Sequence, residues 1–180
     1  MRVIAGRLGG RRLKAPKGTA TRPTSDRVRE ALFAMLGDVE GASVLDLFAG
    51  TGALGIEALS RGARSAVFIE RNPGAARVLS DNLNALGISG DEGEVRRIDA
   101  FAGLRSAQVS KETYDLVFID PPYRQAPEWG IELSAMLPSL LTPDARVVVE
   151  SDRRAPLELQ IPIERDRRYG DTSITIHRHQ

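Results

Sequence analysis

Mainly apolar runs alternate with amphipathic stretches along most of the chain. From residue 43 onward, short runs typical of buried strands are each followed by a segment whose apolar residues recur every three or four positions, as in a helix. The pattern predicts strands at 43–48, 65–70, 94–99, 114–120 and 145–151. It predicts helices at 52–62, 73–87, 100–104 and 128–141, the last of them interrupted by Pro138.

Strands that alternate with helices form a parallel sheet with helices on both faces. Near the C-terminal end, residues 159–179 instead predict two strands that turn at Gly170 and Asp171, which adds antiparallel pairing at one edge. The expected fold is therefore α/β, with a mostly parallel, seven-stranded sheet.

Two elements are expected before this alternation begins. Residues 2–16 form two short segments around a Gly-Gly pair, a pattern typical of a β-hairpin. A helix is expected to begin after Ser25 or Thr24, either of which can cap it, and to end at Gly37. Its apolar face consists of Val28, Ala31, Leu32, Met35 and Leu36.

Composition narrows the class of protein. The 180 residues suffice for one domain, and 42% hydrophobic with 27% charged residues is typical of a globular chain. No apolar run approaches the ~20 residues of a membrane span, and no signal-like segment opens the chain, so we expect a cytoplasmic protein. The absence of cysteine excludes disulfides and cysteine nucleophiles. The two histidines, His177 and His179, lie at the end of the chain, which argues against a histidine triad or a metal site.

The net charge of +1 conceals an uneven distribution. Residues 1–30 contain nine Lys and Arg and two acidic residues, whereas the rest of the chain contains sixteen basic and twenty-two acidic residues. A basic arm at 1–24 on a main domain at 25–180 is suited to binding a polyanion, although it can also be an ordinary solvated tail. We expect a monomer. The candidate nucleic-acid contacts are Arg2, Arg7, Arg11, Arg12, Lys14, Arg22, Arg27, Arg29 and Arg124.

The sequence DLFAGTGALG, residues 46–55, contains a glycine pattern that fits either a nicotinamide dinucleotide or S-adenosylmethionine. Gly50 and Gly52 allow a tight turn and a close approach to a ligand because they have no Cβ. Asp46, at the end of the preceding strand, suits a ligand with an ammonium or sulfonium group and would repel a pyrophosphate. It therefore favours S-adenosylmethionine. The alternative is that Asp46 only caps amides of its own loop.

Acidic residues also end the next two predicted strands. Glu70 can accept hydrogen bonds from both hydroxyls of a ribose, which suits either cofactor, or it can be a solvated charge. Asp99, together with the Ala100 backbone, can bind the edge of an adenine, or it can cap a helix.

The tetrapeptide DPPY follows the fourth predicted strand and is therefore expected at the same edge of the sheet. The Asp120 carboxylate and the Pro121 carbonyl can each accept an N–H bond from an exocyclic amine, which aims the nitrogen lone pair at a methyl donor. Pro121 and Pro122 stiffen the loop. Tyr123 offers a face for a base, and such stacking is worth about 1–3 kcal/mol. The alternative is a rigid turn with a packed tyrosine.

The motifs RVIAGRLGGRRLKAP, RPTSDRVREALF, DLFAGTGALGIEALSRGA, IERN and DPPY occur in an order that resembles the bacterial 16S ribosomal RNA guanine-N2 methyltransferases, over about residues 2–151. The resemblance implies a Rossmann-like class I methyltransferase fold, S-adenosylmethionine as cofactor, and a guanine of 16S RNA in an assembled or assembling small subunit as substrate. It implies that the cofactor is bound by Asp46, Phe48, Ala49, Gly50, Thr51, Gly52, Glu70, Asp99 and Ala100. It places the amine in a catalytic site formed by Asp120, Pro121, Pro122 and Tyr123.

Other functions are compatible with some of these motifs. A DNA adenine or cytosine amino-methyltransferase shares DPPY but usually has an added target-recognition domain. A protein glutamine methyltransferase more naturally has Asn in place of Asp120. A NAD-dependent oxidoreductase explains the glycines but not DPPY, and an inactive RNA-binding module does not need Asp46, Glu70 or Asp120. Trp129 is either a packing residue or a platform for a base.

Overall fold

The computed structural model describes residues 1–15, 25–121 and 126–180. Its strands are β1 (Ser43–Asp46), β2 (Ser65–Ile69), β3 (Gly93–Arg96), β4 (Tyr114–Ile119), β5 (Leu141–Asp152), β6 (Ile163–Tyr169) and β7 (Thr172–Arg178). Its helices are α1 (Asp26–Leu36), α2 (Ala53–Ser60), α3 (Pro73–Leu86), α4 (Ala100–Val109), α5 (Ala126–Met136) and the short 3₁₀ helix η1 (Leu137–Leu140). No helix among the described residues is long and apolar enough to cross a membrane.

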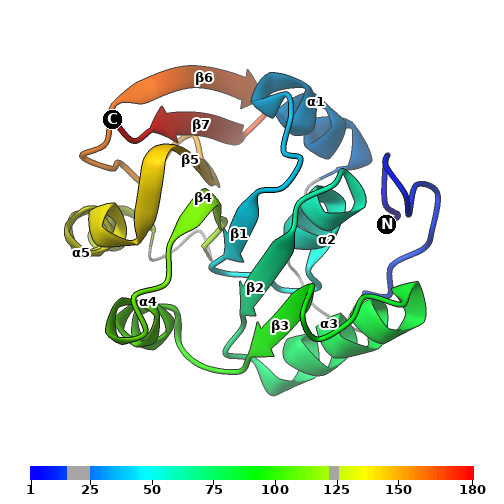
Figure 1. The fold of residues 1–180 in the computed structure, drawn as a ribbon. Coiled ribbons are helices and arrows are strands. Elements are labelled where there is room, and N and C mark those ends of the chain that lie inside the picture. Colours follow the sequence, from blue (N-terminus) through cyan, green and yellow to red (C-terminus); the bar gives the residue numbers. More distant parts are fainter. Residues whose placement is uncertain (16–24, 122–125) are drawn as a thin grey trace.

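The seven strands form one sheet in the order β3-β2-β1-β4-β5-β7-β6. Strands β1 to β5 are parallel, while β7 pairs antiparallel with both β5 and β6 (Figure 1). The expected mostly parallel sheet with a closing antiparallel pair is confirmed. Because β1 lies between β2 and β4, the segments that follow these three strands meet at one edge of the sheet.

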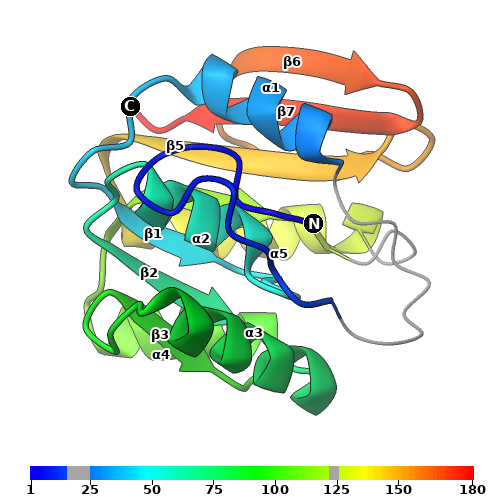
Figure 2. The same cartoon turned by 90° about the vertical axis from the view of Figure 1, so that its right-hand side faces the viewer.

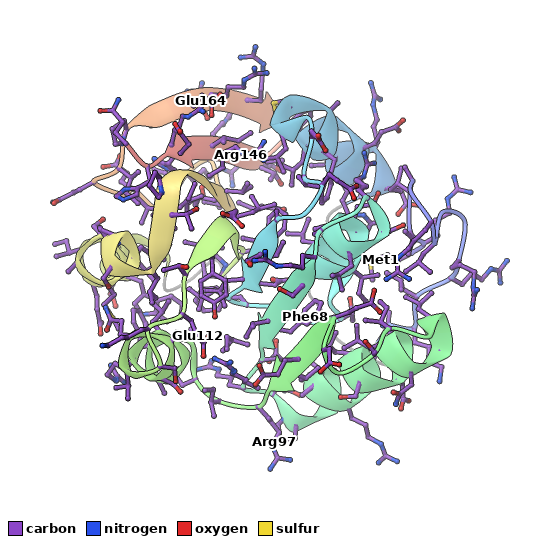
Figure 3. All side chains as sticks on the ribbon, viewed as in Figure 1. Met1, Phe68, Arg97, Glu112, Arg146 and Glu164 are labelled. Atoms are coloured by element: carbon purple, nitrogen blue, oxygen red, sulfur yellow. The ribbon has the colours of Figure 1, made fainter. Side chains whose placement is uncertain are left out.

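Helices cover both faces of the sheet. In Figure 1, α1, α2 and α3 lie on the side of the N-terminal segment, and α4 and α5 lie on the opposite side. Each face has its own cluster of buried apolar side chains. Phe68 of β2 belongs to the first cluster and is completely buried (Figure 3). The Cε1 atom of its ring lies 2.3 Å from the position that a Cβ on Gly55 would occupy. Only glycine at this position therefore allows α2 to pack so closely on the sheet.

Local sequence signals set most helix ends. Ser25 caps α1 by accepting the Val28 amide, and Asn72 caps α3 by accepting the amides of Gly74 and Ala75. The helix expected at 100–104 continues to Val109, because Leu104 and Ala107 remain on its buried face. The cap predicted at Thr24 or Ser25 is therefore confirmed at Ser25, whereas the predicted length of α4 was too short.

The N-terminal segment folds back on itself as a short form of the expected hairpin. Arg2 and Arg12 form an antiparallel bridge, and the amides of Val3, Gly10 and Leu13 donate across it to the carbonyls of Arg11, Val3 and Met1. The amides of Ile4 and Ala5 bond outside the hairpin, to the Glu57 carboxylate on α2. The segment lies across α2 and α3 (Figure 2), with Val3, Leu8 and Leu13 buried in the core of that face. Hydrogen bonds to α2 therefore supplement a short cross-strand ladder.

Candidate active site

Acidic side chains gather at the carboxyl edge of the sheet. Asp46 ends β1, Glu70 follows β2, and Asp120 follows β4. Glu150, which is 4% exposed, lies near the end of β5, the strand next to β4. Among the described residues, Asp46, Glu70 and Asp120 form no ion pair with a Lys or Arg side chain. Within the described part of the chain, no basic side chain therefore neutralises these three carboxyl groups.

Asp46 is buried and interacts with the glycine loop. Its Oδ2 accepts the Gly55 amide at 3.1 Å, which is the capping role considered from the sequence. Burial, with a smaller contribution from the nearby Glu70, raises the pKa of Asp46 to about 7, although the Gly55 hydrogen bond opposes this. The carboxylate is thus poorly solvated and gains from a cation placed beside it.

Asp120 is half-buried at the end of β4. Burial, followed by repulsion from Glu150 and Asp46, raises its pKa well above the usual range of a carboxyl group. Sequence reasoning missed Glu150, although an acid that interrupts the apolar run VVVES was a usable signal. Close carboxylates with raised pKa values are a common feature of functional sites.

The glycines of the loop have different roles. Gly50 has φ +54°, and nothing lies within 4 Å of the position where a Cβ would be. Gly52 has φ +81°, but its missing Cβ would lie 2.2 Å from Leu79 Cδ1 on α3. Gly52 is therefore needed for its left-handed conformation and for packing against α3, whereas the space beside Gly50 is open.

Glu70 and Asp99 both bond to backbone amides. Glu70 accepts the amide of Gly50 at 2.8 Å and that of Asn72 at 2.7 Å, so it fixes the glycine loop relative to β2. Asp99 caps α4 by accepting the Phe101 amide at 3.0 Å. Each carboxylate oxygen has a second lone pair, so these bonds leave acceptor capacity for a ligand.

Trp129 packs against two aromatic side chains from the candidate cofactor loops. It stacks on Phe48, with ring centroids 5.4 Å apart and planes 4° apart, and meets the edge of Phe101 at 5.6 Å. Phe48 lies in the loop after β1, and Phe101 is the second residue of α4. The packing alternative for Trp129 is therefore the one observed, and the contact joins α5 to that loop and to α4.

Most basic residues of the arm contact the protein itself. Arg2 lies 3.5 Å from Asp26, Arg7 lies 2.6 Å from Glu92, and Arg11 donates to the carbonyl of Ala85 at 2.9 Å. Lys14 lies 3.5 Å from Asp81. These groups are exposed, and such pairs contribute about 0–1 kcal/mol, so phosphates can replace their acidic partners at little cost.

The structure corrects the prediction made for Arg29. We expected it at the RNA, but its side chain is completely buried and bonds to the carbonyl of Arg2 and to Asp26. It also lies 4.0 Å from the equally buried Glu57. Arg29 therefore fastens α1 to α2 and to the N-terminal segment, while Arg27 and Arg12 are exposed. The candidates Arg22, Pro122, Tyr123 and Arg124 lie outside the described residues.

The strand order, the glycine loop after β1 and the helices on both faces define the Rossmann-like fold of S-adenosylmethionine-dependent methyltransferases. A solved structure with this fold is the RNA methyltransferase of Salinibacter ruber in complex with S-adenosyl-L-homocysteine. It matches with a TM-score of 0.65 and 25% identity, covering 87% of this chain and 93% of that one.

The family model described as Conserved hypothetical protein 95 matches residues 1–178, and the chain belongs to this family. It is 38% identical over 187 residues to YlbH of Bacillus subtilis, covering 99% of this chain and 98% of that protein. It is 37% identical over 159 residues to Ribosomal RNA small subunit methyltransferase D of Haemophilus influenzae, covering 87% and 81% of the two chains. The family resemblance inferred from the motifs is confirmed.

Proposed function

We propose that the chain transfers a methyl group from S-adenosylmethionine to the exocyclic N2 of a guanine in 16S ribosomal RNA. The observation that carries the proposal is the group of carboxylates at the carboxyl edge of the sheet, with Asp46 and Asp120 both poorly solvated and neither paired with a described Lys or Arg. A ligand with ammonium and sulfonium groups offsets that charge. The cofactor supplies an electrophilic methyl group on its sulfonium.

The residues present fit this cofactor. Nothing lies within 4 Å of the Cβ position of Gly50, and the carboxylate of the buried Asp46, which ends the strand before this loop, suits the cofactor's ammonium. Glu70 is held in place by two backbone amides, with acceptor capacity left for ribose hydroxyls. Asp99 and Ala100, at the start of α4, are assigned to the adenine edge. Phe48, Ala49, Thr51 and Gly52 complete the proposed cofactor-binding set.

Asp120 and Pro121 act on the acceptor amine. The Asp120 carboxylate and the Pro121 carbonyl each accept one N–H bond, which turns the nitrogen lone pair out of the ring plane and fixes its direction. As the N–C bond forms, the bond between the methyl group and the sulfonium would break and S-adenosylhomocysteine would leave. The nitrogen then carries a positive charge and must lose a proton. Asp120 accepts it, and its raised pKa makes it a better base for this step. Pro122 and Tyr123 are assigned to rigidity and to base stacking.

The substrate assignment has separate support. The Haemophilus influenzae relative is named for the RNA of the small ribosomal subunit. In this chain, exposed arginines and Lys14 of the N-terminal segment can neutralise RNA phosphates. The N2 atom of guanine follows from the motif resemblance, and an assembled or assembling subunit is the proposed acceptor.

In the decisive experiment, the protein and methyl-labelled S-adenosylmethionine are incubated with each of three methyl acceptors. These are undermodified small subunits, their naked RNA and duplex DNA. Labelled nucleosides are then separated by chromatography. We expect labelled N2-methylguanosine from the RNA of the subunits. We expect transfer by Asp120→Ala to be at least about 100-fold slower, because this variant loses the carboxylate that accepts a hydrogen bond from the amine and then its proton. Label in DNA would instead identify a DNA methyltransferase.

Asp91→Ala provides the matched control. Asp91 is an exposed carboxylate just before β3, at the amino edge of the sheet and opposite the proposed site, and its loss is expected to leave the rate unchanged. Equal rates for the wild type and Asp120→Ala would contradict the assigned role of Asp120, whichever nucleoside is labelled.

A further inference from the structure

Asn82 is a buried amide on α3 that links two functional segments. Its side chain is part of a residue only 2% exposed. Its Oδ1 accepts the Lys14 amide at 2.8 Å, and its Nδ2 donates to the carbonyl of Lys14 at 3.2 Å and to that of Thr51 at 3.1 Å. One side chain therefore bonds the backbone of the N-terminal segment and the backbone of the glycine loop.

The two segments have different proposed partners. Lys14 belongs to the basic segment, and its Nζ lies 3.5 Å from Asp81 with both side chains largely exposed. Thr51 lies between Gly50 and Gly52, in the loop assigned to the cofactor. In Figure 2 the N-terminal segment crosses α2 and then reaches α3. Helix α3 begins after the carboxyl end of β2.

Helix α3 supports the glycine loop at two points. Leu79 fills the space beside Gly52, and Asn82, three residues later on the same helix, holds the carbonyl of Thr51. A buried amide satisfies its donors and acceptors only in one arrangement, because an unpaired polar group in the interior costs free energy. The positions of Lys14 and Thr51 are therefore tied to each other.

We propose that Asn82 is a positioning residue that makes RNA binding by the N-terminal segment and cofactor binding by the glycine loop interdependent. This inference rests on the proposed function. RNA that orders Lys14 also orders Asn82 and Thr51, so that less conformational entropy is lost when the cofactor binds. The effect is reciprocal, since each ligand must raise the affinity for the other by the same factor.

The test is a binding cycle measured by calorimetry. S-adenosylhomocysteine, which cannot donate a methyl group, is titrated into the protein alone and into the protein saturated with naked small-subunit RNA. We expect RNA to tighten the binding at least about fivefold in the wild type. In Asn82→Ala and Asn82→Ser the factor is expected to fall to about one, because the direct link between Lys14 and Thr51 is lost. The smaller serine leaves room for water to satisfy the backbone groups, which favours folding.

Asn84→Ala is the matched control. Asn84 is an exposed asparagine on the same helix whose side chain makes no hydrogen bond to a described residue, so the wild-type factor should persist. Thermal unfolding of each variant identifies a merely structural role. A lowered Tm with an unchanged factor in both Asn82 variants would overturn the inference.

The outcomes separate this inference from the proposed function. The wild-type protein can bind both ligands and transfer methyl groups while RNA leaves its affinity for S-adenosylhomocysteine unchanged. That result overturns the coupling and leaves the proposed function standing. A wild-type protein that binds neither S-adenosylhomocysteine nor RNA removes the basis of both.

Discussion

The burial of Asp46 links cofactor binding to pH at the scale of a single residue. Its pKa of about 7 in the folded protein lies above the ordinary value of a carboxyl group, so the free protein holds a proton at Asp46 through most of the acidic range. In the absence of cofactor, this group contributes stability at low pH that is lost as the pH rises toward 7. A cationic cofactor needs the ionised form and must therefore displace that proton.

We expect the affinity for S-adenosylmethionine to fall as the pH decreases from about 7 to about 5, by up to about tenfold per unit. Calorimetry in two buffers of different ionisation enthalpy should show proton release on binding. Asp46→Asn should bind weakly and without this pH dependence, since the titrating group is gone. A wild-type affinity that is constant between pH 5 and 7 would contradict the role of Asp46, whereas a slope that persists in Asp46→Asn would assign it to another carboxylate such as Asp120.

Buried charge also connects whole elements. Arg29 of α1 and Glu57 of α2 are both inaccessible, and Glu57 accepts the amides of Ile4 and Ala5 as well as Arg61 Nε at 2.7 Å. Desolvation lowers the pKa of Arg29, and Glu57 and Asp26 oppose that effect. The pair therefore holds α1, α2 and the N-terminal segment together.

Arg29→Met is expected to lower the free energy of unfolding by about 3 kcal/mol, because it leaves Glu57 buried with fewer partners. The low end of the usual range applies, since Arg61 still pairs with Glu57. Arg27→Met, at an exposed position on the same helix, should change stability by no more than about 0.5 kcal/mol. Urea unfolding of both variants measures the difference, and equal midpoints with equal slopes would show that the buried pair is unimportant.

At the scale of the whole molecule, the N-terminal segment and the pair of helices α4 and α5 lie on opposite sides of the sheet (Figure 1). Because the ion pairs of the segment are exposed and weak, we expect RNA to compete for its basic groups in a salt-dependent manner.

Arg12→Ala should weaken RNA binding and reduce the slope of log K against log salt concentration by about 1, as for one lost phosphate contact. Arg12 is exposed and its guanidinium has no described ion-pair partner, so it is available to a phosphate without breaking an existing pair. Arg105→Ala on α4, on the opposite face, is the control and should leave the slope unchanged. Fluorescence anisotropy over a range of salt concentrations checks both. The same slope for Arg12→Ala and the wild type would exclude this residue from the RNA contact.

The sequence alone determined the strand and helix succession, the caps at Ser25 and Gly37, and the acidic residues at the strand ends. These features depend on neighbours within a few positions, where hydrophobic period and backbone hydrogen bonding dominate. The placement of Asp46, Glu70 and Asp120 at one edge followed from the general geometry of parallel sheets.

Only the tertiary structure decided which polar residues are buried and what they hold. Arg29 was indistinguishable by type from Arg27 two positions away, and only the packing of α1 against Glu57 placed it in the interior. Asn82 received its role from Lys14 and Thr51, which are 68 and 31 residues away in the chain. Such contacts depend on how elements meet, and the hydrophobic pattern, which records only which face is inside, does not contain that information.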